Sequence, residues 1–233
     1  MSNRLIDPSE SVFLHGPRKR QFELFFALKV FWEFVRGFRA LHFVGPCVTV
    51  FGSARFKDGH RYYEVAQELG QKIATELGMT VMTGGGPGIM EAANRGAFDV
   101  GAKSIGLNIT LPAEQLPNPY ITPELCFQFR YFALRKLHFL LRAKALVVFP
   151  GGFGTLDELF DALTLRQTNR MQQIPIIMYG RAYWDRVIDL EFLANEGVID
   201  DRHLQLVDYA ETPVEAWDKI VAFYAPGGPG ATG

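Results

Sequence analysis

The chain has 233 residues, with 24 Lys and Arg against 25 Asp and Glu, and 48% of its residues are hydrophobic. This composition is typical of a folded globular protein and excludes the collagen-like, disulfide-rich and disordered classes. The net charge of -1 gives no basic surface of the kind that nucleic acid requires, so we expect no nucleic-acid partner.

Residues 1–45 predict an N-terminal helical extension. Apolar and charged side chains of residues 20–43 fall on different helical faces, which predicts an amphipathic helix with an aromatic apolar side. Charged residues interrupt this stretch throughout, so we expect no membrane span, and no signal peptide is evident ahead of it. We expect the apolar side to pack on the protein's own core or in a homodimer interface, rather than on a lipid surface.

Residues 46–225 alternate short apolar runs with longer helical patterns. This alternation predicts an α/β domain, a Rossmann-like open parallel sheet with helices on both faces, which we expect to bind a nucleotide. The expected strands are 47–52, 79–83, 104–109, 125–129, 145–149 and 174–179, and the expected helices are 60–77, 88–100, 131–143, 155–169, 181–195 and 212–224. Proline-rich residues 110–124 predict an extended surface loop, and residues 226–233 predict a disordered tail.

Cys47 and Cys126 are the only cysteines, and both lie beside apolar segments. They predict two buried thiols in a reducing compartment, and we therefore expect a cytoplasmic protein. No His, Cys and Asp spacing suggests a metal site.

Two glycine loops each follow an expected strand and open an expected helix. They are residues 83–91 (TGGGPGIME) and residues 150–158 (PGGFGTLDE). At such a junction, bare backbone N–H groups and the positive end of the helix dipole form an anion site, and glycine lets a phosphate approach the backbone. Both loops should lie at the carboxyl edge of the sheet, where ligands bind. The pair predicts a nucleotide-like ligand.

Two common nucleotide motifs do not fit these loops. The third glycine of the dinucleotide fingerprint is replaced by Glu91 in the first loop and by Asp157 in the second, and neither loop ends in the Gly-Lys-Ser/Thr of a P-loop. Each loop instead carries an acid in the adjoining helix. Glu158 fits a capping box with Thr155, and Glu91 fits an i,i+4 pair with Arg95. An acid beside a bound phosphate would otherwise need nearby cations, so a functional interpretation stays open.

Cations cluster in and around the helix expected at 131–143, namely Arg130, Arg135, Lys136, Arg142 and Lys144. Helical spacing separates a polar stripe from an apolar one: Tyr131, Arg135, His138 and Arg142 against Ala133, Leu134, Leu137, Leu140 and Leu141. We interpret the apolar stripe as buried and most of the polar stripe as solvated. We also expect Arg135 or Lys136 to reach the same sheet edge as Glu158.

Both loops match motifs of a known family. Residues 84–97 (GGGPGIMEAANRGA) and 150–168 (PGGFGTLDELFDALTLRQT) closely resemble the paired GGGxGxME and PGGxGTxxE motifs of the Lonely Guy family, the cytokinin riboside 5′-monophosphate phosphoribohydrolases. The resemblance covers roughly residues 47–220. Because a helix precedes it, the chain looks more like the longer bacterial branch, which is labelled lysine decarboxylase-like.

The resemblance implies hydrolysis of the N-glycosidic bond of a nucleoside 5′-monophosphate, such as AMP or a cytokinin riboside monophosphate, to free base and ribose 5-phosphate. It implies Arg135 and Glu158 as the catalytic pair, with Arg135 holding the carboxylate ionised and oriented. It implies a substrate site formed by Ser53, Gly84, Gly85, Gly86, Gly88, Glu91, Lys136, Gly151, Gly152, Gly154 and Thr155. It further implies a homodimer or higher homo-oligomer that helps build the site, and no cofactor.

One departure from the family bears on the base. The family's Met-His-x-Arg-Lys reads here FALRK at residues 132–136, without the histidine, which leaves the base preference open. Two other functions also remain open: a non-catalytic carrier of a nucleotide or of molybdenum cofactor, and a lysine decarboxylase. The latter would need pyridoxal phosphate on a Schiff-base lysine, and no lysine stands in a motif that singles it out.

Overall fold

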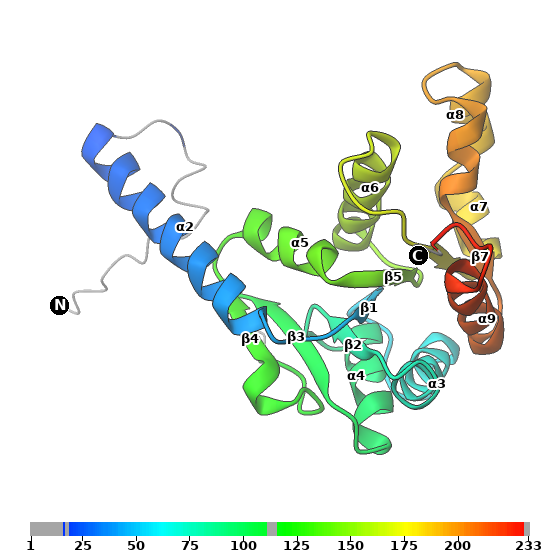
Figure 1. Ribbon diagram of the computed structural model, residues 1–233, viewed down its shortest axis with the longest axis horizontal. Helices are drawn as coiled ribbons and strands as arrows, with labels where there is room; N and C mark the ends of the chain where they lie inside the picture. Colours follow the sequence, from blue (N-terminus) through cyan, green and yellow to red (C-terminus); the bar gives the residue numbers. More distant parts are fainter. Residues whose placement is uncertain (1–15, 17–18, 111–115, 231–233) are drawn as a thin grey trace.

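The computed structural model describes residues 16, 19–110 and 116–230. The remaining residues lie outside this description; they include residues 111–115 of the proline-rich loop, the last residues of the expected tail and most of the segment ahead of the first helix. Seven parallel strands form one sheet in the order β4-β3-β2-β1-β5-β6-β7 (Figure 1). The strands are β1 Cys47–Phe51, β2 Thr80–Thr83, β3 Ser104–Ile109, β4 Cys126–Phe129, β5 Ala143–Val148, β6 Ile176–Tyr179 and β7 Asp208–Ala210.

The helices confirm the alternating pattern that the sequence predicts. They are α2 Arg20–Leu41, α3 Arg61–Thr75, α4 Ile89–Asp99, α5 Phe132–Leu141, α6 Phe153–Gln167, α7 Arg181–Val187, α8 Leu190–Asn195 and α9 Pro213–Tyr224, with short 3₁₀ helices at Pro123–Leu125 and Asp201–Leu206. The α/β fold class is therefore confirmed. Within the described residues, none of these helices combines the length and apolar character needed to cross a membrane.

Two details differ from the expected elements. Strand β7 was not predicted, because its three residues are too few to show an alternating pattern. The single helix expected at 181–195 is divided into α7 and α8. Ile188 takes an extended conformation between them, and the side chain of Asp189 caps α8 by accepting a hydrogen bond from the Phe192 amide at 2.8 Å.

The sheet separates two hydrophobic cores. On one face, α3, α4 and α9 pack on Val48 and Val50 of β1. On the other face, α5, α6 and α7 pack on Phe51 and its neighbours, because successive side chains of a strand point to opposite faces. This confirms the helices on both faces that the sequence predicts.

The sheet order places a crevice between β1 and β5. The chain builds β2, β3 and β4 outward from β1 and then returns to lay β5 on the other side of β1. At such a reversal the loops after the two central strands diverge, which leaves an opening at their carboxyl ends. The loop after β5 is the second glycine loop, and the loop after β1 begins at Gly52.

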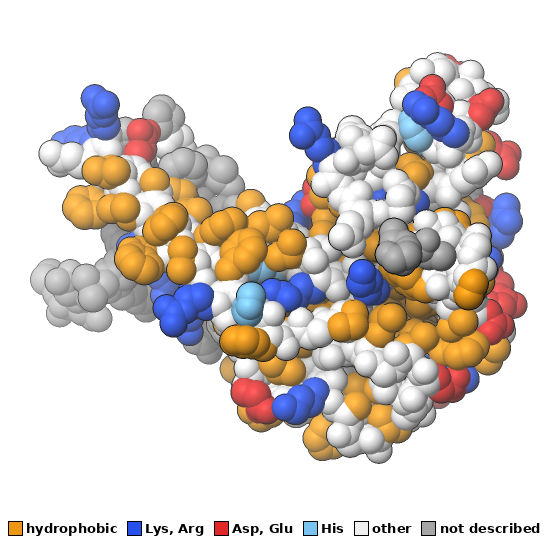
Figure 2. Space-filling view, in the orientation of Figure 1, with side chains coloured by type: hydrophobic (Ala, Val, Ile, Leu, Met, Phe, Trp, Pro, Cys, Tyr) orange, Lys and Arg blue, Asp and Glu red, His pale blue; other side chains and the backbone are white. Residues whose placement is uncertain are grey.

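Helix α2 docks on the start of α5. The Glu33 carboxylate accepts a hydrogen bond from the Arg130 amide at 2.8 Å, just ahead of α5. The rings of Phe26 and Tyr131 meet edge to face with centroids 5.1 Å apart. The opposite face of α2 is exposed, and Figure 2 shows hydrophobic side chains gathered along this helix. Its exposed apolar residues are Leu24, Phe25, Leu28, Phe31 and Trp32.

The interpretation of the two stripes of α5 was wrong. Tyr131 and His138, from the polar stripe, are buried, whereas Leu137 and Leu141, from the apolar stripe, are 39% and 50% exposed. Helical spacing separates two faces but does not decide which face the rest of the protein covers. Burial under α2, with Arg142 nearby, lowers the pKa of His138 to about 4.

Two smaller expectations concern the thiols and the tail. Cys47 is fully buried and Cys126 half-buried, and neither forms a disulfide. Residues 226–230, expected in the disordered tail, form turns in which the Gly230 amide donates to the Phe223 carbonyl at 2.9 Å.

Candidate active site

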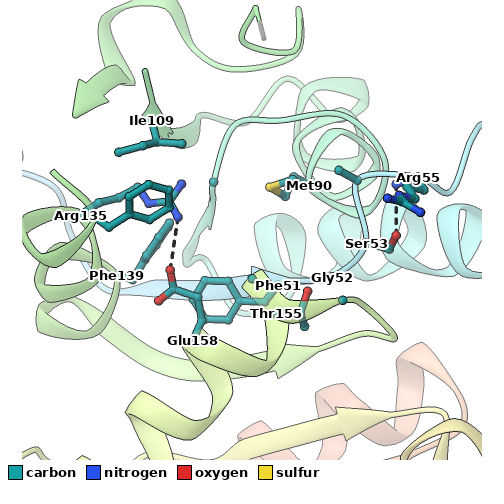
Figure 3. A pocket seen from close by; sticks show the side chains of 15 residues that line it. Phe51, Gly52, Ser53, Arg55, Met90, Ile109, Arg135, Phe139, Thr155 and Glu158 are labelled. Atoms are coloured by element: carbon teal, nitrogen blue, oxygen red, sulfur yellow. Dashed lines mark hydrogen bonds and ion pairs between the residues drawn. The ribbon is translucent and has the colours of Figure 1, made fainter. Parts of the chain in front are cut away.

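A cavity of about 310 Å³ opens at the carboxyl ends of β1, β2 and β5, in the predicted crevice. Seven of the residues expected at the site line it together: Ser53, Gly84, Arg135, Gly152, Gly154, Thr155 and Glu158. Figure 3 shows Arg135 and Glu158 on one side of the cavity and Ser53 on the other, with Thr155 between them. Residues from four separate segments of the chain therefore share one site.

Arg135 of α5 and Glu158 of α6 form a partly sheltered ion pair. Nη2 of Arg135 donates to Oε1 of Glu158 at 3.4 Å, and the two side chains are only 13% and 6% exposed. The rings of Phe132 and Phe139 lie 5.1 and 5.4 Å from the guanidinium carbon. The pair is thus held against an apolar wall at the edge of the cavity.

Burial raises the pKa of Glu158 to about 7, although the positive charges of Arg135 and Lys136 act to lower it. The loss of hydration of the carboxylate therefore outweighs its attraction to the two cations. Arg135 thus favours the ionised form of the carboxylate, while burial favours the protonated form. A carboxyl group with such a pKa suits proton transfer at physiological pH.

The capping-box interpretation of Glu158 was wrong. Helix α6 begins at Phe153, after the N-cap residue Gly152, and no side chain caps it. Thr155 therefore lies inside the first turn, and Glu158 lies in the second turn, too far along to return to the cap. The carboxylate faces the cavity and Arg135 instead.

The second glycine loop is open toward the cavity. At both Gly152 and Gly154, a Cβ atom would have no described atom of the protein within 4 Å outside its own neighbours in the chain. These glycines precede or begin the first turn of α6, and the first N–H groups of a helix have no acceptor one turn earlier within it. The Thr155 amide is an exception, because it donates to the Gly152 carbonyl at 3.0 Å. Gly151 lies behind them, where its carbonyl accepts a hydrogen bond from the Tyr183 hydroxyl at 2.6 Å. The loop presents bare backbone to the space where an anion would lie.

The first glycine loop is packed against protein. Gly88 has φ +72°, and a Cβ there would overlap the carbonyl oxygen of Ser53, which accepts a hydrogen bond from the Ile89 amide at 3.0 Å. Asn118 covers the loop from the other side. Its backbone N–H donates to the Gly85 carbonyl at 2.9 Å, and its side-chain Nδ2 donates to the Gly86 carbonyl at 3.1 Å. Gly85, Gly86 and Gly88 therefore do not line the cavity, and Gly84 is the loop's contribution to it.

Glu91 and Lys136 also lie outside the cavity lining. Glu91 accepts a hydrogen bond from the Tyr63 hydroxyl at 3.0 Å. The expected pair between Glu91 and Arg95 does not form among the described contacts, because Arg95 bonds to Asp58 at 2.7 Å. Lys136 Nζ lies 2.7 Å from Oδ1 of Asp157.

Several lining residues were not expected from the sequence. Arg55 lies two residues after Ser53 in the loop that follows β1, and this place at a strand's carboxyl end was a signal that could have marked it. The apolar wall gives no such signal, because its members come from four different elements, β1, α4, β3 and α5: Phe51, Met90, Ile109, Phe132 and Phe139. Within the described residues, no cluster of His, Cys, Asp and Glu could hold a metal ion.

The family model described as "Possible lysine decarboxylase" matches residues 90–220, more than half of the chain. The chain belongs to this family. It is the Lonely Guy family that the two glycine motifs resemble, and the resemblance is confirmed. Lysine decarboxylation itself does not fit the site, because no lysine is among the described residues that line the cavity and Lys136 is paired with Asp157.

Two curated relatives of this family are plant proteins. "Probable cytokinin riboside 5′-monophosphate phosphoribohydrolase LOGL6" of Oryza sativa subsp. japonica is 24% identical over 166 residues, which span 70% of this chain and 65% of the relative. The cytokinin riboside 5′-monophosphate phosphoribohydrolase LOG3 of Arabidopsis thaliana is 25% identical over 169 residues, which span 71% of this chain and 76% of that one. The match thus covers just under two thirds of the first protein and three quarters of the second.

Solved structures share the fold. The protein TM1055 is 27% identical and aligns over 75% of this chain and 98% of its own, with a TM-score of 0.57. The molybdenum cofactor binding protein of Rippkaea orientalis is 24% identical over 77% of this chain and 99% of its own, with a TM-score of 0.54. This second likeness concerns the fold alone.

Proposed function

We propose that the protein hydrolyses the N-glycosidic bond of a nucleoside 5′-monophosphate, releasing the free base and ribose 5-phosphate. The observation that carries the proposal is Glu158: a buried carboxyl group, 3.4 Å from Arg135, in a cavity whose floor includes the open glycine loop of α6. Membership of the Lonely Guy family and the names of its plant relatives support the same reaction.

The substrate is placed by its phosphate. The amides at Gly152 and Gly154 and the hydroxyl of Thr155 suit the 5′-phosphate, since the N-terminus of α6 favours a negative charge. The ribose then extends toward the side of the cavity that Glu158 and Arg135 occupy. Binding of the phosphate supplies interaction energy away from the reacting bond, which fixes the sugar in position.

The chemistry follows from charge. As the bond between C1′ and the base nitrogen breaks, the electron pair leaves with the base and positive charge develops on the sugar. The Glu158 carboxylate stabilises this charge and accepts a proton from the water whose oxygen bonds to C1′. The released base takes up a proton, so that water is divided between the two products. Arg135 orients the carboxylate.

The decisive experiment compares Glu158→Gln with Asp157→Asn. Both substitutions remove one carboxylate from α6, but Asp157 is 53% exposed and lies outside the cavity lining. We expect Glu158→Gln to fold and to lose about 10²- to 10³-fold in kcat, as typically follows the loss of one group that stabilises transition-state charge. Asp157→Asn should keep wild-type turnover. Ribose 5-phosphate release would be measured with AMP, other purine and pyrimidine monophosphates, N6-isopentenyladenosine monophosphate and adenosine.

The same panel separates the alternative function. If the wild-type protein binds nucleotides tightly and turns over none of them, the protein is a carrier and the hydrolase proposal is wrong. Wild-type turnover by Glu158→Gln would also refute the proposed role of the carboxylate. The base preference would be read from the panel directly.

We further propose that two copies pair in the cytoplasm through the exposed face of α5 and its neighbours. A groove of about 540 Å³ lies between α5 and α6, and its lining includes Leu137, Leu141 and Met171. Leu137 and Leu141 are the exposed apolar residues of α5, so the groove is part of an exposed apolar surface. Ala133, which replaces the family's histidine, lines this groove and not the cavity. Analytical ultracentrifugation would test the pairing, and a monomer at all working concentrations would refute it.

A further inference from the structure

The cavity contains a cation that the proposed reaction has not used. Its described lining includes two arginines, Arg135 and Arg55. The guanidinium of Arg135 is engaged by the Glu158 carboxylate. For the Arg55 guanidinium, no hydrogen bond or ion pair with a described residue is found, whereas Lys136 and Arg95 are bound to carboxylates outside the cavity. Among the described cations that line the cavity, Arg55 is thus the one whose charge is not already neutralised by a described carboxylate.

The backbone that carries Arg55 is held by both glycine loops. The Ser53 amide donates to the Pro150 carbonyl at 3.0 Å, at the start of the second loop. The Ser53 carbonyl accepts from the Ile89 amide at 3.0 Å, and Gly88 lies directly against it. The Arg55 amide closes a turn by donating to the Ser53 hydroxyl at 3.1 Å. These bonds fix where the Arg55 side chain leaves the chain, although the side chain itself is exposed.

The position of Arg55 separates it from the catalytic pair. Figure 3 shows Ser53 and Arg55 on one side of the cavity and Arg135 and Glu158 on the other, with Thr155 between them. A guanidinium beside Glu158 would be neutralised by it. A guanidinium at the far side is free to meet the second charge that the site must accept, the dianion of a phosphate ester.

We propose that Arg55 binds the 5′-phosphate of the substrate and of the sugar product, and so selects phosphorylated ligands over the free nucleoside. The inference rests on the proposed function for the identity of the ligand. It assigns to Arg55 the role of a substrate-binding cation, which the family resemblance implied for Lys136. Because the phosphate is present before, during and after bond cleavage, Arg55 contributes to binding equally in the ground state and the transition state.

The experiment compares Arg55→Ala with Lys57→Ala, which removes the same charge from the same loop at an exposed residue outside the cavity lining. Binding of AMP, ribose 5-phosphate, inorganic phosphate and adenosine is measured by calorimetry, and KM and kcat are measured for AMP. We expect Arg55→Ala to weaken binding of AMP and ribose 5-phosphate by about 10- to 100-fold and to raise KM, with kcat within about threefold. Binding of adenosine should not change, and Arg55→Lys should recover part of the loss.

The outcomes separate this inference from the proposed function. Wild-type protein that binds AMP without hydrolysing it refutes the hydrolase, while the loss of AMP binding in Arg55→Ala still supports the phosphate role. Wild-type hydrolysis with unchanged AMP affinity in Arg55→Ala refutes the role of Arg55 alone. An equal loss in Lys57→Ala would mean a general effect of surface charge and would also overturn the assignment, as would a variant that loses adenosine binding to the same extent.

Discussion

The two glycine loops are alike in sequence and differ in what their glycines are for. In the first loop, a side chain at Gly88 would overlap the loop after β1, and the carbonyls of Gly85 and Gly86 are bound by Asn118. In the second loop, a side chain at Gly152 or Gly154 would meet empty space at the cavity. The glycines of the first loop allow it to pack against the segment that carries Ser53 and Arg55. The second is the surface on which a ligand is proposed to lie.

A glycine motif can therefore have either of two structural causes. A glycine is required either because protein stands where its side chain would be, or because a ligand does. The sequence cannot distinguish these two causes, since both require the same residue, glycine. Substitutions can, because the first kind should cost stability and the second should cost binding.

The largest effect should follow from Gly88→Ala. Its backbone has φ +72°, and the added methyl would overlap the Ser53 carbonyl. We expect a loss on the order of 3 kcal/mol or more in the free energy of unfolding, measured by denaturant titration. Gly59→Ala is the matched control, because Gly59 also has positive φ but no described atom within 4 Å of its Cβ position. It should lose about 1 kcal/mol from backbone strain alone. Equal losses would show that packing at Gly88 is unimportant.

Gly152→Ala should show the opposite pattern. Its φ of −89° and ψ of −155° are accessible to alanine, and no described atom lies near the added methyl. We expect the free energy of unfolding to change by less than about 0.5 kcal/mol and KM for AMP to rise about tenfold or more, because the methyl occupies the space of the phosphate. Gly45→Ala is the control, because Gly45 is exposed, lies far from Gly152 in the sequence and has no described atom within 4 Å of its Cβ position. It should change neither the free energy of unfolding nor KM. A stable Gly152→Ala protein with normal KM would contradict the proposed phosphate position.

The smallest effect concerns pH. Since the pKa of Glu158 is about 7 and the carboxylate is the active form, kcat/KM should rise with pH through about 7. One pH unit below the pKa the rate should be about tenfold below its plateau. The phosphate of AMP titrates near pH 6, so AMP binding to Glu158→Gln over the same range gives the substrate's own contribution. A pH-independent rate between pH 6 and 8 would contradict the role of Glu158.

The raised pKa of Glu158 also predicts how the stability of the folded protein changes with pH. Because the pKa of Glu158 is higher in the folded protein than the usual 4.5, the folded state holds an extra proton between about pH 4.5 and 7. Ionisation of Glu158 therefore costs stability as pH rises through this window. Glu158→Gln removes the titration, so its melting temperature relative to wild type should increase from pH 5 to pH 8.

Much of the fold could be predicted because its signals are local. The strands from Cys47 to Tyr179 are short apolar runs, and each glycine loop stands between such a run and a helical pattern. The contact between Arg135 and Glu158 was also expected, since both residues belong to motifs of the Lonely Guy family. The burial of His138 and the exposure of Leu137 were not, because they depend on where α2 docks.

The α/β class, the two glycine loops and the residues in their motifs follow from the order of amino acids, because periodicity and glycine spacing act within a few residues of the chain. Three features depend on the folded protein: which glycine loop is open, the burial of Glu158 away from the helix cap, and the presence of Arg55 instead of Lys136 in the cavity lining. These outcomes depend on atoms from distant segments, such as Asn118 over the first loop and Arg135 beside Glu158. Burial and pairing arise only when the strands bring such segments together.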